Sequence, residues 1–175
     1  RSDEFLLIVG AGGVGLAGIG MAKAVVKAKI IVAEIDPAKR AAALEAGAEV
    51  VLDNSETSAR EELISLTNGG PNAAIDFVGA PATVEFAFGV MAKGASLVLV
   101  GLYGGAAQLS TSLFPLKVNN ILGSFVGTQQ DLVELLQLFR EGKVKSVPIV
   151  RRPLREAPQA IQELREGKAL GRYVL

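Results

Sequence analysis

The sequence predicts an α/β fold in which a parallel sheet is covered by helices on both faces. Short apolar runs alternate with helical stretches along most of the 175 residues, which is the pattern of consecutive β-α-β units. The apolar runs are continuous rather than alternating, as in strands buried on both faces. Half of the residues are hydrophobic, and a chain of this length can bury one sizeable core.

Six apolar runs are predicted to form a single sheet, with four helices between the strands and a fifth after the last strand. The expected strands are Phe5–Val9, Ile30–Ala33, Val50–Leu52, Ala73–Val78, Ser96–Val100 and Asn120–Ser124. The expected helices are Gly13–Lys27, Pro37–Ala46, Ala59–Thr67, Pro81–Met91 and Asp131–Glu141. Right-handed crossovers between these strands give a doubly wound, Rossmann-type six-stranded parallel sheet, which binds ligands at the carboxyl ends of its strands.

Two helix boundaries carry their own chemical signals. Asp36 followed by Pro37 is typical of an N-cap and a first helical position. Gly47 and Gly142 lie where glycine ends a helix in the left-handed conformation. Beyond Gly142 we expect a short strand that Arg151–Pro153 interrupts, an amphipathic helix over Ala157–Arg165, and a final strand over Arg172–Leu175. This tail is predicted to depart from the β-α-β alternation.

Composition excludes several classes of function. Eighteen basic residues balance 18 acidic residues, so no broad positive field attracts nucleic acid or an anionic membrane. Cysteine and histidine are both absent, which excludes disulfides, Cys/His zinc sites and Ser-His-Asp triads from these residues. No signal peptide or long apolar run is visible. We therefore expect a cytoplasmic protein without nucleic-acid or membrane partners, and, because it begins at Arg1 rather than Met, a fragment or a processed product.

The strongest local motif is a glycine turn between the first strand and the first helix. Gly10-Ala11-Gly12-Gly13-Val14-Gly15 has the G-x-G-x-x-G spacing of dinucleotide-binding turns. In such turns the first glycine permits the tight turn, the second admits a pyrophosphate, and the third allows close packing of helix and strand. The helix N-terminus then offers unpaired N–H groups to phosphates. Glycine turns also occur for packing alone, so the motif needs its context.

That context is an acidic residue 19 positions after Gly15, at the end of the second apolar run. Glu34 can accept hydrogen bonds from both ribose hydroxyls of an adenosine, and its charge repels a 2′-phosphate. This arrangement favours NAD over NADP. Lys39 can reach the ribose from the following helix, although a solvated helix face explains it equally well. A P-loop is excluded, because Leu16-Ala17 replaces its Lys-Ser/Thr.

With these motifs in place, the chain resembles the cofactor-binding domain of the zinc-type alcohol dehydrogenases, in the medium-chain dehydrogenase/reductase superfamily. The resemblance covers nearly all 175 residues. It is carried by Gly10–Gly15, Glu34–Lys39, Ala46–Ala48, Asp76–Gly79, Val98–Leu102, Gly123–Gly127 and Gly171-Arg172.

The resemblance implies roles for residues along the expected cofactor cleft. The cofactor-binding residues it indicates, together with the glycine turn, are Gly10, Gly12, Gly13, Val14, Gly15, Glu34, Lys39, Val78, Gly79, Val100, Gly101, Leu102, Leu122 and Arg172. Backbone at Val100, Leu102 and Leu122 would hold the nicotinamide carboxamide, and Arg172 would lie near the pyrophosphate. The alternatives are ordinary core positions for the apolar residues and a solvated charge for Arg172.

The resemblance also implies what this chain would lack. Relatives carry an N-terminal catalytic domain with the ligands of a catalytic zinc, and we expect the chain by itself to bind NAD but not to turn over, with no catalytic or metal-binding residue of its own. Residues 1–146 are expected to form the NAD-binding domain, and residues 147–175 to complete that absent catalytic domain and so to expose an apolar face. The strand at Ile121 and the segment Ser112–Asn119 resemble the region through which two such domains pair their sheets, which predicts a homodimer.

The function expected from these features is the NAD(H)-binding part of an alcohol or polyol dehydrogenase, which transfers a hydride between nicotinamide and an alcohol or carbonyl substrate. Three alternatives remain open at this point. They are an NAD(H)-sensing regulatory domain without catalysis, an NADPH-dependent quinone reductase of the same superfamily, and an FAD-binding fold. Glu34 disfavours the second, and the matches around Gly101 and Gly123 have no role in the third.

Overall fold

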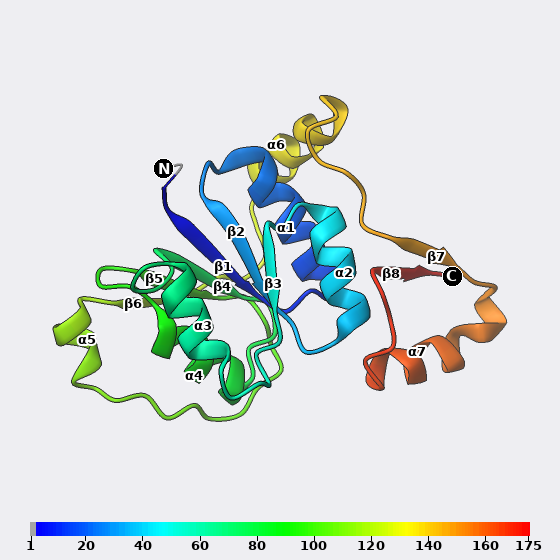
Figure 1. The fold of residues 1–175 in the computed structure, drawn as a ribbon. Helices are drawn as coiled ribbons and strands as arrows, with labels where there is room; N and C mark the ends of the chain where they lie inside the picture. The colour runs from blue at the N-terminus through cyan, green and yellow to red at the C-terminus, as the bar shows by residue number, and fades with distance from the viewer. Residues whose placement is uncertain (1–2) are drawn as a thin grey trace.

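The computed structural model describes residues 3–175, and its central feature is a six-stranded parallel sheet (Figure 1). The strands are β1 (Phe5–Val9), β2 (Lys29–Ala33), β3 (Val50–Leu52), β4 (Ala73–Asp76), β5 (Ser96–Leu99) and β6 (Asn120–Gly123). Their order across the sheet is β3-β2-β1-β4-β5-β6. The chain winds outward from β1 to β3, returns to the middle at β4, and then winds the opposite way. The doubly wound fold predicted from the sequence is confirmed.

Helices cover both faces of the sheet, with α1 (Gly13–Val25) and α2 (Pro37–Ala46) on one face and α3 (Ala59–Leu66) and α4 (Pro81–Val90) on the other. The short helix α5 (Leu113–Lys117) packs against the core of α3 and α4, and α6 (Gln129–Arg140) has no buried residue. Because side chains alternate across a strand, β1 divides its apolar residues between two cores. Leu7 and Val9 pack with residues of α3 and α4, whereas Leu6 and Ile8 pack with residues of α1 and α2.

The tail forms a small unit of its own beside the main sheet. It consists of β7 (Ile149–Arg151), the 3-10 turn η1 (Leu154–Glu156), α7 (Ala157–Arg165) and β8 (Arg172–Val174). Strands β7 and β8 pair in parallel as a separate two-stranded sheet. The prediction that the tail departs from β-α-β alternation is therefore wrong, because α7 connects two parallel strands. Val147 and Leu170 pack against the core under α1 and α2, and Leu154 and Leu164 are exposed.

Several element ends differ from the sequence prediction, and local hydrogen bonds explain two of them. Strand β4 ends at Asp76 rather than Val78 because the Asp76 carboxylate accepts the amides of Val78 and Gly79 and turns the chain. Helix α6 begins at Gln129 rather than Asp131.

The reason for the early start of α6 is a reciprocal cap. Thr128 Oγ1 accepts from the Asp131 amide, and Asp131 Oδ2 accepts from the Thr128 amide.

Helix α1 ends at Val25 instead of Lys27, and β5 and β6 each end one residue early. The sequence did not predict α5, a five-residue helix that contains a proline.

Candidate functional site

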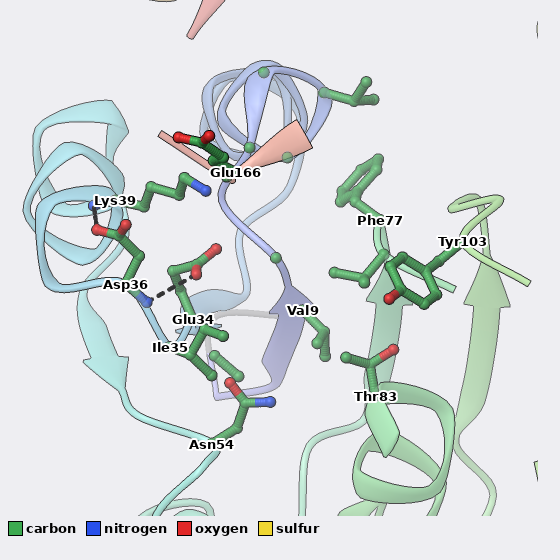
Figure 2. A pocket seen from close by; sticks show the side chains of 18 of the residues that line it. Val9, Glu34, Ile35, Asp36, Lys39, Asn54, Phe77, Thr83, Tyr103 and Glu166 are labelled. Atoms are coloured by element: carbon green, nitrogen blue, oxygen red, sulfur yellow. Dashed lines mark hydrogen bonds between the residues drawn. The ribbon is translucent and has the colours of Figure 1, made fainter. Parts of the chain in front are cut away.

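A large cavity opens at the carboxyl ends of β1, β2 and β4, where the direction of winding reverses. Ligands of doubly wound sheets bind at this place. Its volume is about 590 Å³, within the range of small-molecule sites. It is lined by Val9, Gly10, Gly12, Gly13, Val14, Gly15, Ala33, Glu34, Ile35, Asp36, Lys39, Asn54, Phe77, Val78, Thr83, Tyr103, Glu166, Gly167 and Arg172, most of which Figure 2 shows. We call this cavity the main pocket.

The glycine turn forms the floor of the main pocket, and its glycines serve different needs. Gly10 has φ +89°, which non-glycine residues rarely adopt. A side chain at Gly15 would overlap the carbonyl oxygen of Gly10, so this position must stay bare for the helix to meet the strand. A side chain at Gly12 would meet no atom within 4 Å and would project into the pocket. Gly12 thus leaves open the space that a phosphate needs.

The N-terminus of α1 points into this space. Gly12 is the N-cap, and no side chain caps the helix. The first helical hydrogen bond runs from the Leu16 amide to the Gly12 carbonyl, over 2.8 Å. The amides of the first turn before Leu16 have no partner within the helix, and they combine with the positive end of the helix dipole. This end of the pocket therefore suits an anion.

Glu34 lies at the end of β2, and its carboxylate joins the two loops beside it. Oε2 accepts from the Ala11 amide at 2.7 Å, and Oε1 accepts from the Asp36 amide at 3.0 Å. The side chain is 8% exposed. A carboxylate can accept about four hydrogen bonds, so Glu34 keeps acceptor capacity toward the pocket. The hydrogen bonds from these two backbone amides hold the carboxylate in place.

The two basic residues after Glu34 have different surroundings. The Lys39 side chain lines the main pocket, where Figure 2 shows it between Asp36 and Glu166. The Arg40 guanidinium instead donates to the carbonyls of Glu34 and Ile35, at 2.7 and 2.8 Å, and to Asp53 at 2.8 Å. Arg40 is therefore held by three acceptors and does not itself line the main pocket.

Arg172 reaches the pocket from the tail. A Cβ atom placed on Gly13 would lie 2.8 Å from Nε of Arg172, so the guanidinium group packs directly on the first turn of α1. Both Gly13 and Arg172 line the main pocket. The sequence separates these two residues by most of the chain, and the fold places a cation beside the anion-binding helix end.

Five of the residues indicated by the sequence lie beside the main pocket rather than in its lining: Gly79, Val100, Gly101, Leu102 and Leu122. Gly79 and Gly101 are in close backbone contact, since a side chain on either would overlap the other loop. Leu102 is 80% exposed and Leu122 is 53% exposed. Val78 belongs to the lining, and its carbonyl accepts from the Tyr103 amide at 3.1 Å, which joins this group to the pocket wall.

The sequence analysis missed Asp76, which organises one side of the site. Asp76 is fully buried. Its Oδ1 accepts from the amides of Val78 and Gly79 at 2.8 and 3.0 Å, and its Oδ2 accepts from the Thr83 hydroxyl at 2.7 Å. An acidic residue at the end of an otherwise apolar strand is a signal that could have identified it.

Other missed residues line the pocket directly. Asn54 follows β3, Thr83 lies in the first turn of α4, and Tyr103 follows β5 (Figure 2). Glu166 and Gly167 come from the tail. None belongs to a sequence motif, and only the tertiary fold brings them to the pocket.

Among residues 3–175, no group of three or more Cys, His, Asp or Glu side chains is arranged to hold a metal ion. In the same part of the chain, no helix combines the length and the apolar character needed to cross a membrane.

Comparison with known proteins gives consistent matches over the whole chain. A family model described as zinc-binding dehydrogenase matches residues 13–141. An NAD-dependent alcohol dehydrogenase of Sulfurisphaera tokodaii is 36% identical over 175 residues, which are 99% of this chain and 50% of the relative. One from Saccharolobus solfataricus is 36% identical over 172 residues, covering 97% of this chain and 50% of that protein.

A solved structure agrees with these matches. The alcohol dehydrogenase of the archaeon Aeropyrum pernix superposes with a TM-score of 0.92 at 32% identity, over 98% of this chain and 49% of that one. The chain therefore spans about half the length of the curated relatives it matches.

Proposed function

Because the chain belongs to the zinc-binding dehydrogenase family, we propose that it is the NAD(H)-binding part of an alcohol or polyol dehydrogenase. NAD supplies the hydride acceptor or donor when bound, and the protein supplies binding and orientation. Two relatives named NAD-dependent alcohol dehydrogenases support this proposal. They favour an enzyme over a regulatory sensor or a quinone reductase. The activity of the whole protein is part of the proposal, since the chain spans about half of those relatives.

A single observation carries the proposal. The Glu34 carboxylate and the open N-terminus of α1 face the same cavity, one suited to a ribose diol and the other to a diphosphate. A dinucleotide requires these two chemistries side by side. The fixed position of Glu34, held by the amides of Ala11 and Asp36, prepares the acceptor before any ligand arrives.

The surroundings of the phosphate position fit the same ligand. Gly12 leaves open space, and a side chain there would occupy it. Arg172 packs on Gly13 and places a permanent positive charge beside the helix end. We assign the diphosphate to the amides of the α1 N-terminus and to Arg172.

The proposal includes a preference for NAD over NADP. A 2′-phosphate carries between one and two negative charges at neutral pH, and Glu34 would lie against it. Arg40 donates through Nη1 to two carbonyls and to Asp53 and does not line the main pocket. Lys39 is assigned to the ribose edge of the pocket.

We place the nicotinamide at the Val78 end of the main pocket. Backbone of Gly79, Val100, Gly101, Leu102 and Leu122 would then hold its carboxamide. The contact of Gly79 with Gly101 and the bond from Tyr103 to Val78 support this placement, because they join the two loops that would surround the ring.

Several finer features complete the proposal. An alcohol or carbonyl substrate and any catalytic zinc would be bound by parts of the whole protein other than residues 3–175. Two chains would pair through the outer edge of β6, which has no neighbouring strand in the described sheet. The protein would act in the cytoplasm.

Gly12→Val tests the proposal directly. Gly12 has φ −69° and ψ −171°, a conformation that valine also adopts, so the fold should persist while the side chain fills the phosphate position. We expect NADH affinity, measured by fluorescence titration, to fall about tenfold or more, with an unchanged urea midpoint. Gly20→Ala, on the same helix but outside the main pocket, is the control. Equal NADH affinity in Gly12→Val and the unaltered chain would refute the assignment.

A further inference from the structure

The tail contributes an acidic side chain, Glu166, to the main pocket, whose lining also includes Glu34 and Asp36. Glu166 and Gly167, at the end of α7, line the pocket together with Lys39. Figure 2 shows the Glu166 carboxylate on the same side of the pocket as the Lys39 ammonium. A Cβ atom placed on Gly167 would lie 3.9 Å from Nζ of Lys39. The turn after α7 therefore borders the ribose edge at which Lys39 was placed.

This turn holds the Glu166 carboxylate in a fixed position. Gln162 Nε2 donates to its Oε1 at 2.7 Å, and Lys168 Nζ pairs with its Oε2 at 2.6 Å. The hydrogen bond from Lys168, followed by that from Gln162, keeps the pKa of Glu166 below its ordinary value, so the side chain is ionised at neutral pH. Gly167 has φ +72°, and its amide donates to the Leu164 carbonyl at 3.1 Å.

Bonds within the tail and contacts between the tail and the core under α1 and α2 position Glu166, so its place at the pocket does not depend on α7 alone. Arg152 forms a bidentate pair with Glu163 at 3.0 and 2.6 Å, and the Tyr173 hydroxyl donates to the same carboxylate at 2.7 Å. These bonds join α7 to both tail strands. Leu170 packs in the core under α1 and α2, which seats the turn beside the pocket.

We propose that Glu166 is a second specificity-determining residue, which excludes a 2′-phosphate from the main pocket by offsetting the positive charge of Lys39. The inference rests on the proposed function, because it assumes that an adenine dinucleotide occupies this pocket. Lys39 by itself would attract a phosphate at the ribose edge. Glu34, Asp36 and Glu166 line the same pocket as Lys39, so three carboxylates share this pocket with the Lys39 ammonium, and the C-terminal end of α7 adds the negative pole of its dipole. Lys168 pairs with Glu166 but lies outside the pocket lining.

The chain contains a matched control for this residue. The sequence Arg-Glu-Gly-Lys occurs twice, at 140–143 after α6 and at 165–168 after α7. Glu141 accepts from Gln137 at 2.8 Å and pairs with Lys143 at 2.7 Å, as Glu166 does with Gln162 and Lys168. Glu141 does not line the main pocket. Removing its charge changes the same local contacts without changing the proposed site.

The experiment compares Glu166→Gln with Glu141→Gln by titrating each folded variant with NADH and with NADPH. We expect Glu166→Gln to raise the affinity for NADPH about threefold or more relative to NADH, and the gain to shrink as salt screens the charges. Glu141→Gln should leave the ratio unchanged.

Two results would overturn the inference, and they can be told apart. If the unaltered chain binds NADH but Glu166→Gln and Glu141→Gln give the same ratio of affinities, Glu166 has no role in specificity while the proposed function stands. If the unaltered chain does not bind NADH, the proposed function fails and the inference fails with it.

Discussion

Among single residues, Glu34 matters most, because its carboxylate both joins two loops and, in the proposed function, binds the ribose. Its carboxylate is held by the amides of two loops, and the neighbouring Arg40, which donates to the carbonyls of Glu34 and Ile35 and to Asp53, does not line the main pocket. The preference for an unphosphorylated ribose thus depends on the negative charge that Glu34 presents to the main pocket.

Replacing Glu34 with arginine should reverse that preference. Glu34→Arg is expected to weaken NADH binding and to favour NADPH by about tenfold or more, since repulsion of the 2′-phosphate becomes attraction. Isothermal titration with both cofactors measures the change. Glu34→Gln serves as the control, because it removes the charge but keeps an acceptor for a neighbouring amide. NADH affinity unchanged in both variants would mean that this residue does not touch the ribose.

The sequence identified this residue and the glycine turn because both lie in one continuous strand-turn-helix-strand stretch. It could not identify Asn54, Tyr103 or Glu166, which reach the main pocket from separate loops. Nor could it show that Arg40 is bound to carbonyls, since that depends on Asp53 lying beside β2. Residues brought together only by the tertiary fold leave no local pattern.

At the scale of elements, the turn after β4 depends on Asp76. The fully buried carboxylate accepts two amides and one hydroxyl, and these bonds end the strand and begin α4. The sequence placed β4 correctly but ran it two residues too far, because an apolar Phe77-Val78 continues the strand pattern. Side-chain hydrogen bonds to the backbone override that pattern.

Asp76→Ala should destabilise the fold by about 3 kcal/mol or more, because buried amides and a hydroxyl lose a charged acceptor. Urea unfolding measures the loss. Asp131→Ala removes the exposed cap of α6 and should cost only about 1 kcal/mol, which makes it a suitable comparison. Similar costs for the two changes would contradict the role assigned to Asp76.

The tail unit should respond to acid. The hydrogen bonds from Arg152 and Tyr173 lower the pKa of Glu163 from 4.5 to about 2, so ionised Glu163 stabilises the tail. This contribution is fully present above the unfolded pKa near 4.5 and is lost as pH falls toward about 2. Hydrogen exchange of β7 and β8 should therefore quicken over that interval.

Glu163→Gln provides the check on that assignment. It should speed exchange in the tail at neutral pH and remove most of the dependence on pH between 4.5 and about 2. A tail that loses protection over the same interval in the variant would owe its acid response to another group.

At the scale of the whole molecule, the sheet has one open edge that suits self-association. The amides of Asn120 and Ser124 donate to β5, and because bonding alternates along a strand, those of Ile121 and Gly123 face outward. Near this edge, Val118, Phe125 and Val126 are exposed. The alternation of strands and helices predicted a doubly wound sheet, whereas the edge position of the strand at Ile121 was implied only by the family resemblance.

Gly123→Pro tests the predicted dimer. Proline at this position removes an N–H that faces outward. A free edge strand tolerates this loss, whereas pairing with a second strand would lose a hydrogen bond. No atom lies within 4 Å of the new Cβ position. Light scattering after gel filtration should give a dimer for the unaltered chain and for Gly123→Ala, and a monomer for Gly123→Pro. A monomer in all three would exclude pairing through β6.

The central claim is that the main pocket binds NAD(H), and calorimetric titration of the purified chain tests it most directly. We expect saturable heat with NADH at one site per chain and markedly weaker binding of NADPH. If no heat appears with NADH while a known NAD-dependent dehydrogenase responds under the same conditions, the claim is contradicted.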